Sequence, residues 1–374
     1  MSSENVQIFN VQSKKDWKQF VMFPYHLYRH HPFWVPPLIS DQKKLLDFDL
    51  NPFFSHASGR FFLARRGNII VGRIAALVDD LHNQIHHEKT GFFGFLAVEN
   101  DYEAAAALLD AARNWVRKQG MKQFRGPVNP SQNEDCGLLI DAFDSPPVIM
   151  MPYNPEYLVH FLDQYGLKKA VDLYAYLLDG TKPQPPKLVR VAELVAKKPG
   201  VNIRPIDMKH FFQEARMIWK VYNSAWANNY GFVPMTEEEF VNLAKHLKQV
   251  VVPDLALMAE IHGKPAGFSL SIPDMNQALI HLNGRLFPLG IFKLLHYSRK
   301  INQLRIIILG VLPEYRRTGV DAALYGHTWK NAVSRGYIKG EMSWILENNT
   351  MMNRSARMLG GKIYKTYRIY EMQS

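Results

Sequence analysis

The chain has 374 residues, more than a single hydrophobic core usually organises, so its length predicts two domains. Its 47% hydrophobic and 12% aromatic residues exclude a disordered chain. With 45 Lys and Arg against 34 Asp and Glu, the net charge of +11 indicates a negatively charged partner: a nucleotide cofactor, an anionic membrane or a nucleic acid. No compact basic run with interleaved aromatic residues is present, so we expect no nucleic-acid partner.

Cysteine usage and hydropathy predict the compartment. The single cysteine, Cys136, cannot form an internal disulfide, which suits a reducing environment. The first residues lack the basic start and apolar core of a signal peptide, and no run reaches 18 apolar residues. We therefore expect a cytoplasmic protein, with contact to the inner face of the membrane as an additional possibility.

The predicted elements form the same series twice. The first series follows an N-terminal helical and aromatic extension (1–54). It has two hairpin strands at 61–64 and 69–74, a third strand at 91–96, a long helix at 102–118, a strand at 122–125, a short helix closing at Gly166 and a last strand at 173–178. The second series has these elements in the same order, at 255–259, 266–270, 305–310, 322–334, 341–346, a helix closing at Gly360, and 363–370.

A repeated order of strands and helices predicts an α+β fold present in two copies. The Pro-rich stretch 181–187 suits an extended connector. We accordingly place an N-terminal domain at 55–180, a linker at 181–200 and a C-terminal domain at 201–374.

The strongest chemical motif is the segment 311–321, which lies between an apolar strand and a helix. Backbone N–H groups of such a turn, with the positive end of the following helix, can bind a pyrophosphate, and Gly319 would let the backbone approach it closely. The motif resembles the signature of the Gcn5-related N-acetyltransferase (GNAT) superfamily: Arg or Gln, two residues, Gly, one residue, then Gly or Ala. Arg316 and Gly319 fit it, whereas Asp321 does not.

The resemblance implies two tandem GNAT folds, each a mixed, mostly antiparallel sheet flanked by helices, and acyl-CoA or acetyl-CoA as co-substrate, with no metal. Residues along the pantetheine arm would be Gly310, Val311 and Leu312. Amides for the pyrophosphate would come from the loop after Arg316, namely Arg317, Thr318, Gly319, Val320 and Asp321. The carboxylate of Asp321 should repel phosphate unless it points away; alternatively, it caps its own helix and no cofactor binds.

The second family feature is an asparagine that leads into the short helix, followed seven residues later by a tyrosine acting as general acid. Asn349 stands at the asparagine position, but Ala356 occupies that of the tyrosine. Glu347, at the end of strand 341–346, is a candidate general base or a helix cap, and His281 is a second candidate base or an ordinary solvated histidine.

The N-terminal copy has Glu99-Asn100-Asp101-Tyr102-Glu103 where a phosphate loop would be needed. Acidic residues there argue against coenzyme A. We therefore interpret this copy as a degenerate partner that supports the C-terminal one.

Three other segments carry competing interpretations. The apolar segment 286–295 is expected to form a buried helix, but with Arg285, Lys293, Arg299 and Lys300 nearby it could instead line an acceptor tunnel or touch a membrane. The aromatic stretch 25–37 poses the same alternatives. His82, His86 and His87 are expected in a polar loop rather than a metal site, because no cysteine or carboxylate stands at helical spacing from them.

These observations predict an acyl-CoA-dependent N-acyltransferase. The acceptor is expected to be a small-molecule or lipid amine, with a long-chain amine favoured by the apolar segment and the basic charge. The alternatives are a non-catalytic binding or scaffold protein on a decayed GNAT fold, and an aminoacyltransferase of the Fem type.

Overall fold

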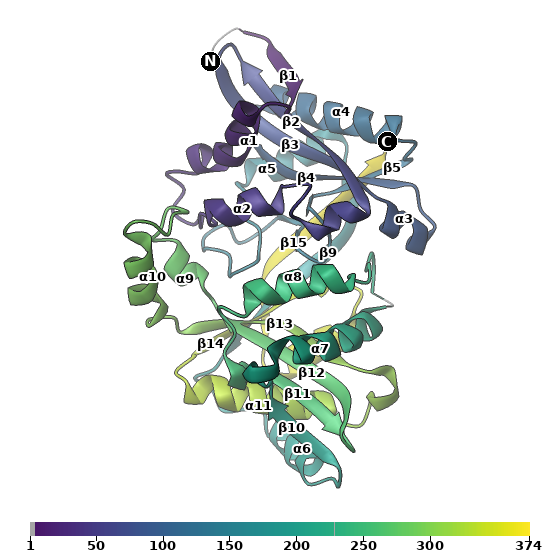
Figure 1. The fold of residues 1–374 in the computed structure, drawn as a ribbon, viewed down its shortest axis with the longest axis vertical. Coiled ribbons are helices and arrows are strands. Elements are labelled where there is room, and N and C mark those ends of the chain that lie inside the picture. The colour runs from purple at the N-terminus through teal and green to yellow at the C-terminus, as the bar shows by residue number, and fades with distance from the viewer. Residues whose placement is uncertain (1–3, 228) are drawn as a thin grey trace. The chain divides into compact units, whose positions relative to one another are not determined.

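The computed structural model describes residues 4–227 and 229–374. It divides into two compact units (Figure 1). Unit 1 consists of residues 1–173, 278–295 and 365–374, and unit 2 consists of residues 174–277 and 296–364.

Unit 1 is built on a mostly antiparallel sheet. Its strands, in spatial order, are β1 (Val6–Asn10), β2 (Ala57–Arg66), β3 (Ile69–Asp79), β4 (Thr90–Val98), β5 (Gln123–Gly126), β15 (Lys362–Gln373) and β9 (Lys168–Asp179). β4 and β5 are parallel. The short strand β8 (Leu138–Leu139) pairs with β15, and β6 (Val128–Asn129) with β7 (Asp135–Cys136). The helices of this unit are α1 (Lys14–Leu27), α2 (Ile39–Leu45), α3 (Asp80–His86), α4 (Tyr102–Lys118) and α5 (Tyr157–Tyr165), with a 3₁₀ turn at Pro52–Ser55.

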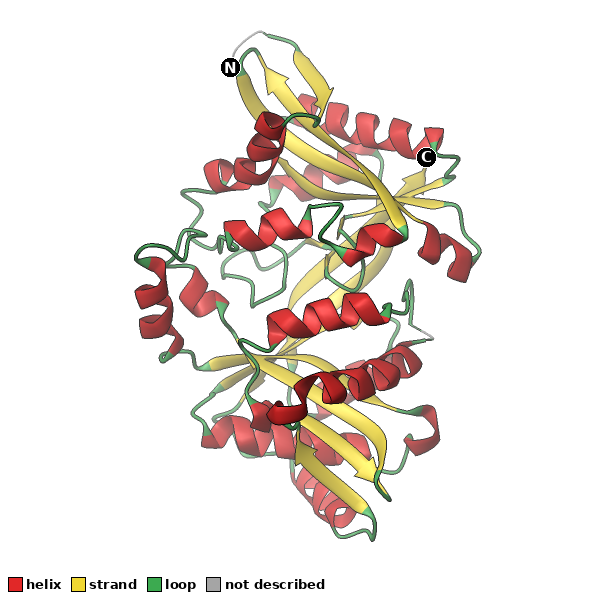
Figure 2. Cartoon of the chain, in the orientation of Figure 1, coloured by secondary structure: helices red, strands yellow, loops and turns green. Residues whose placement is uncertain are grey.

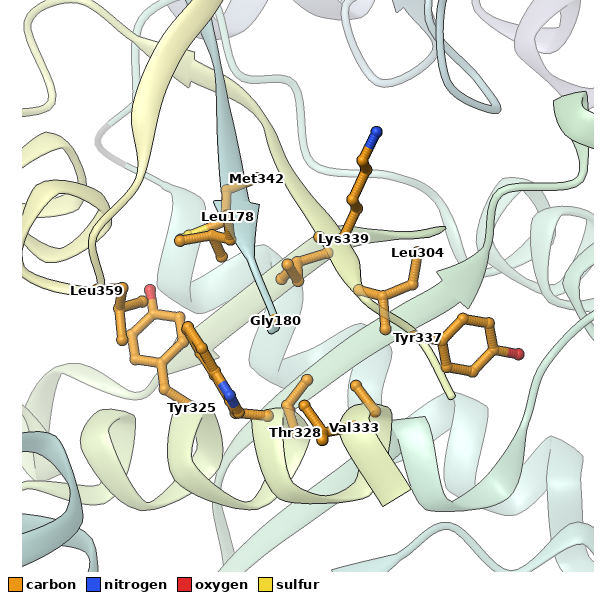
Figure 3. A pocket seen from close by; sticks show the side chains of 14 residues that line it. Leu178, Gly180, Leu304, Tyr325, Thr328, Val333, Tyr337, Lys339, Met342 and Leu359 are labelled. Atoms are coloured by element: carbon orange, nitrogen blue, oxygen red, sulfur yellow. The ribbon is translucent and has the colours of Figure 1, made fainter. Parts of the chain in front are cut away.

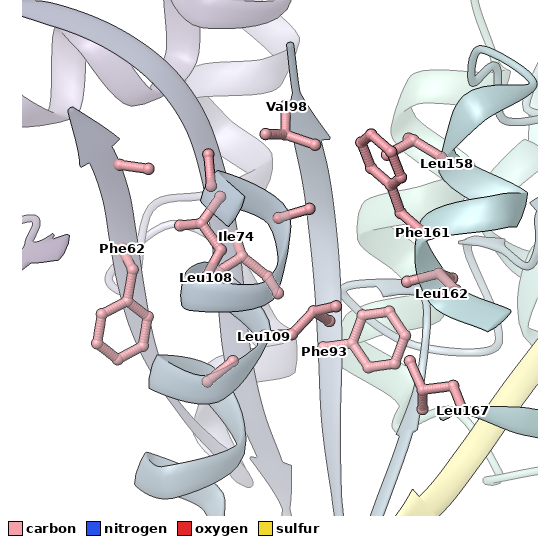
Figure 4. Packing of buried hydrophobic residues seen from close by; sticks show 14 of the residues in the cluster. Phe62, Ile74, Phe93, Val98, Leu108, Leu109, Leu158, Phe161, Leu162 and Leu167 are labelled. Atoms are coloured by element: carbon pink, nitrogen blue, oxygen red, sulfur yellow. The ribbon is translucent and has the colours of Figure 1, made fainter. Parts of the chain in front are cut away.

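The core of unit 1 lies where α4 and α5 pack on this sheet (Figure 4). Helix α4 begins at Asp101, whose carboxylate accepts the N–H of Ala104, and its apolar positions fall on one face. Leu108 and Leu109 on that face are fully buried against Ile74 and Phe93 of the strands.

Unit 2 repeats the arrangement. Its strands, in spatial order, are β9, β14 (Lys339–Leu346), β13 (Gln303–Val311), β12 (Lys264–Pro273), β11 (Ala256–Ile261) and β10 (Val201–Pro205), of which β13 and β14 are parallel. The helices of this unit are α6 (Pro186–Ala196), α7 (Phe211–Trp226), α8 (Glu237–Leu247), α11 (Val320–Ser334) and α12 (Thr350–Met358). Because residues 278–295 belong to unit 1, α9 (Asn276–Leu279) is divided between the two units and most of α10 (Gly290–Ser298) belongs to unit 1. Short 3₁₀ turns lie at Met208–His210, Pro253–Leu255 and Pro313–Tyr315. Long helices pack on the sheet in both units: α4 contacts β2, β3 and β4, and α7 and α11 contact β12 and β13 (Figure 2).

The predicted α+β fold and its repeated order are confirmed, and α4 has the predicted bounds. The division of the chain differs from the predicted one. Residues 181–200 contain α6, whose Leu188 and Val195 are buried in the core of unit 2. The predicted extension contains β1, which pairs with β2, and the last ten residues belong to unit 1. The hydrophobic periodicity of a segment does not show which strands it pairs with or which core it packs into.

Two local expectations were wrong. His82 and His86 lie on helix α3 and not in a polar loop, with His82 buried and its ring nitrogen 3.3 Å from Glu88. Residues 290–295 of the segment 286–295 do lie on a helix, but its apolar side chains are exposed: Phe292 keeps 68% of its surface and Leu295 56%. The sequence of the segment does not show whether the apolar face of its helix is buried against other elements or exposed to solvent.

Candidate functional site

The strands β13 and β14 separate part-way along unit 2. Their parallel pairing runs from Gln303 opposite Lys339 to Ile306 opposite Met342, and both strands then continue to Val311 and Leu346. β13 stays paired with β12 up to Val311, with a register shift between Leu270 and Ser271. The gap therefore opens between β13 and β14, where the resemblance placed the pantetheine arm.

A cavity of about 460 Å³ occupies this opening. It is lined by the separated strand ends, by the loop before α11, by the start of α12 and by the end of α7. The predicted residues among its lining are Gly310, Val311, Arg316, Arg317, Asp321 and Asn349. Strand, loop and helix start thus meet at one cavity, as the resemblance implied.

The loop before α11 has the geometry of an anion-binding turn. Arg317 and Gly319 adopt left-handed conformations, with φ of 66° and 88°, and the helix begins directly after Gly319. A left-handed residue followed by a helical one makes successive N–H groups converge on one side. Among the described residues no side chain caps this helix start. Amides that a helix start leaves without partners favour an anion.

The charges around the loop are mixed. The Arg316 guanidinium donates to the carbonyl of Ala225 at 3.1 Å, and Lys198 donates to that of Thr318 at 3.1 Å. Asp321 is exposed and lines the cavity. The loop therefore carries cations that suit a diphosphate and one carboxylate that opposes it.

Gly319 has a different role from the predicted one. A Cβ built on it would lie 2.7 Å from Val195 and 3.2 Å from Val191, both on α6, and not in the cavity. Its left-handed conformation and the close packing of α6 require glycine there. Leu312, Thr318, Gly319 and Val320 belong to the same segment but are not among the residues that line the cavity.

The helix α12 begins at Asn349, whose side-chain oxygen accepts the N–H of Met352 at 3.1 Å. Asn353 secures the same turn, since its amide donates to the carbonyl of Leu346 at 2.8 Å. Asn349 is therefore a cap that holds the helix at the edge of the cavity. Ala356 is buried in the core beneath it.

The two predicted base candidates lie apart from the cavity lining. Glu347 follows β14 and is half-buried, and its side chain is not part of the lining. His281 is exposed in a turn after α9 and belongs to unit 1, whereas the cavity lies in unit 2.

Sequence reasoning missed Tyr325 and Trp226, both of which line the cavity. Tyr325 is buried on α11, and its hydroxyl lies 3.8 Å from Sδ of Met352 on α12, the helix that carries the catalytic tyrosine in the family pattern. Burial, with a smaller contribution from Asp321, raises the pKa of Tyr325. Tyr325 lies one helical turn after Asp321, and this spacing on the predicted helix could have indicated that it faces the same site. Trp226, from α7, had no such signal.

Tyr325 also lines a second cavity (Figure 3). It shares Ile306, Tyr325 and Met342 with the first, and Leu178 and Leu359 are among its other lining residues. Its volume of about 50 Å³ has room for only a few water-sized groups. Only the larger cavity has space for part of a coenzyme.

The equivalent opening in unit 1 is filled. β4 and β5 pair from Thr90 to Phe92 and then separate, but the N–H of Phe95 donates to the side-chain oxygen of Asn129 at 2.6 Å. The carbonyl of Val98 accepts the hydroxyl of Tyr157 at 2.7 Å. Asp101 caps α4 and also accepts two hydrogen bonds from Arg66.

Within residues 4–227 and 229–374, no group of three or more His, Cys, Asp and Glu residues could hold a metal ion. No helix in these ranges is both long enough and apolar enough to span a bilayer.

Comparison with known proteins agrees with this geometry. A tandem GNAT protein from the clavulanic acid biosynthesis pathway superposes with a TM-score of 0.60 at 14% identity, covering 99% of this chain and 98% of its own. The bacterial ceramide synthase of Caulobacter vibrioides (strain NA1000 / CB15N) is 36% identical over 380 residues, covering 99% of this chain and 98% of its own. The chain belongs to the same family as this bacterial ceramide synthase, and its fold is the tandem GNAT fold.

A further relative is protein YghO of Escherichia coli (strain K12), 37% identical over 368 residues, which cover 96% of this chain and 94% of that protein. No family model matches the chain. The tandem GNAT fold and the full-length relatives together support an acyltransferase function.

Proposed function

We propose that this protein transfers an acyl group from an acyl-coenzyme A to the nitrogen of a long-chain lipid amine. The observation that carries the proposal is the uncapped start of α11 at the mouth of the gap between β13 and β14. An anion-binding turn and an open sheet edge at one cavity suit a ligand with a diphosphate and a slender arm.

The residues present fit coenzyme A. The amides of Arg317, Gly319, Val320 and Asp321, with the guanidinium groups of Arg316 and Arg317, would hold the diphosphate. The edge of β13 at Gly310 and Val311 would lie along the pantetheine. The bound thioester supplies an activated acyl carbonyl. The exposed carboxylate of Asp321 would weaken diphosphate binding without blocking the amides.

The reaction needs a neutral amine, which forms the new N–C bond while the C–S bond breaks. The amine must lose a proton and the leaving thiolate must gain one. We assign the donor role to Tyr325, because a buried tyrosine whose pKa is raised keeps its proton at neutral pH. We keep Glu347, on unit 2 just after β14, as the group that takes the amine proton through solvent, and we assign no role to His281.

The choice of a lipid amine rests on the relative named bacterial ceramide synthase. A ceramide is a long-chain amine acylated on nitrogen. The similarity extends over 99% of this chain, so it includes both units and the whole cavity lining.

A two-step experiment tests the proposal. Calorimetric titration with acetyl-CoA and palmitoyl-CoA measures donor binding. Release of free coenzyme A is then followed with sphinganine, spermidine and glucosamine as acceptors, and mass spectrometry identifies the product. We expect micromolar donor binding and an N-acylated sphinganine. Donor binding without turnover on any amine would refute the proposed acyltransferase activity. Absence of donor binding would favour the scaffold alternative.

A further inference from the structure

Unit 1 exposes a compact group of large apolar side chains. Phe287, Leu289, Phe292 and Leu295 keep 78%, 67%, 68% and 56% of their surface exposed, all within nine residues of chain. Two lie in the loop before α10 and two on the helix itself. We call residues 285–295 the apolar tip. A cluster of this kind marks a surface that contacts another apolar phase.

The charge around the apolar tip has one sign. The 29 residues from Met275 to Gln303 contain four Lys and Arg and no Asp or Glu. Arg285 and Lys293, within the tip, are both exposed. Apolar side chains flanked by cations are the combination that binds anionic lipid surfaces.

The same character extends onto α1 and α2. A cavity of about 940 Å³ next to the tip is lined by Phe287 and Leu286 together with Trp17, Val21, Met22, Ile39, Leu46 and Phe48. Its charged lining residues are Lys14, Lys18, Lys43 and Arg285 against Asp47 and Asp49. Cations therefore outnumber carboxylates in the lining of this cavity as well.

The length of the tip restricts how it can meet a bilayer. Helix α10 has nine residues, about half of what a membrane span requires. It can therefore lie only in the plane of the headgroups, with its apolar side chains toward the acyl chains.

We propose that the apolar tip docks this protein onto an anionic phospholipid bilayer, with Phe287, Leu289, Phe292 and Leu295 inserted below the headgroups and Arg285 and Lys293 facing lipid phosphates. The proposal goes beyond acyl transfer and does not depend on it. Vesicle binding is measured without donor or acceptor, so either proposal can fail alone.

The experiment is flotation of the full chain with vesicles of phosphatidylcholine alone or with 30 mol% phosphatidylglycerol. We expect at least tenfold stronger partitioning to the anionic vesicles, weakened by salt because exposed charges are screened. The triple variant Phe287→Ser, Leu289→Ser, Phe292→Ser should partition to the anionic vesicles at least tenfold more weakly than the wild type. The pair Arg285→Glu, Lys293→Glu should lose the preference for anionic lipid.

Ile69→Ser is the matched control, because Ile69 is a 67% exposed apolar residue of unit 1 that lies outside the tip. It should bind vesicles like the wild type. Circular dichroism checks that each variant is folded. Equal binding by the wild type and the folded triple variant overturns the proposal. The proposal is also overturned if the wild type does not bind vesicles and instead forms a dimer in light scattering that the triple variant abolishes.

Discussion

The indole ring of Trp226 covers the backbone of Gly310. A Cβ built on Gly310 would lie 2.4 Å from Cζ3 and 2.8 Å from Cη2 of that ring, which also stacks on Tyr222 at 5.0 Å. A side chain at 310 must therefore displace Trp226, which lines the cavity. The absence of a Cβ at Gly310 keeps the ring flat against β13 and the cavity open.

Gly310→Val is expected to weaken acetyl-CoA binding at least tenfold, because the displaced indole would enter the space meant for the pantetheine. Calorimetry measures this. The double variant Gly310→Val, Trp226→Gly should recover most of the affinity, since the ring is then gone. A double variant as weak as the single one would mean that the valine itself, and not the indole, disturbs the site.

Tyr325→Phe is expected to lower kcat by roughly 10²-fold, the usual range for loss of a positioned acid, while donor affinity changes little. Burial raises the pKa of Tyr325 above the ordinary 10.0, so the wild-type rate should not decline between pH 7 and about 10 through loss of this proton. The rate of coenzyme A release measures both the change in kcat and its dependence on pH.

Tyr337→Phe is the control for this substitution, because Tyr337 lines only the smaller of the two cavities in unit 2. It should leave kcat unchanged. If both variants were equally slow, the effect of Tyr325 would be one of packing and the proton would come from another group.

Asp321→Asn is expected to tighten binding of coenzyme A several-fold, because a negative charge beside the diphosphate is removed and the side-chain size is kept. The gain should shrink as salt is raised, since Asp321 is exposed. Calorimetry at two salt concentrations checks both statements. Weaker binding by this variant would show that the carboxylate helps to hold the donor.

Asp101→Asn tests the filled helix start of unit 1. Its hydrogen bonds with Arg66 hold the pKa of the Asp101 carboxyl below the ordinary 3.8. A lowered pKa adds stability that is present above the ordinary value and is lost as pH falls through the folded-state value. Asparagine also caps a helix, so only the ion pair with Arg66 is lost. The variant should thus be less stable by about 0.2–1 kcal/mol at pH 7, and the difference should shrink in acid. Urea unfolding at several pH values measures it; a constant difference would contradict the ionic explanation.

Sequence alone predicted the repeated elements well, because hydrophobic periodicity and glycine helix ends are local signals. Both Gly166 and Gly360 take the left-handed conformation expected after a helix. It also singled out the loop between β13 and α11, part of which lines the larger cavity of unit 2. Contributions from distant segments were not predictable in this way: Trp226 reaches Gly310 from 84 positions away in the chain. The role of Gly319 was misjudged for the same reason, since α6 was taken for a linker.

The last strand of the chain has a consequence for how the protein is made. Tyr370 and Met372 pair with Gly126 and Phe124, so β5 of unit 1 gains this neighbour only from residues near the C-terminus. During synthesis, a nascent chain that has passed Gly126 holds an unsatisfied sheet edge for more than two hundred further residues. Chaperone protection is most needed in that interval, and a stop codon that removes only the final strand should send the product to proteolysis.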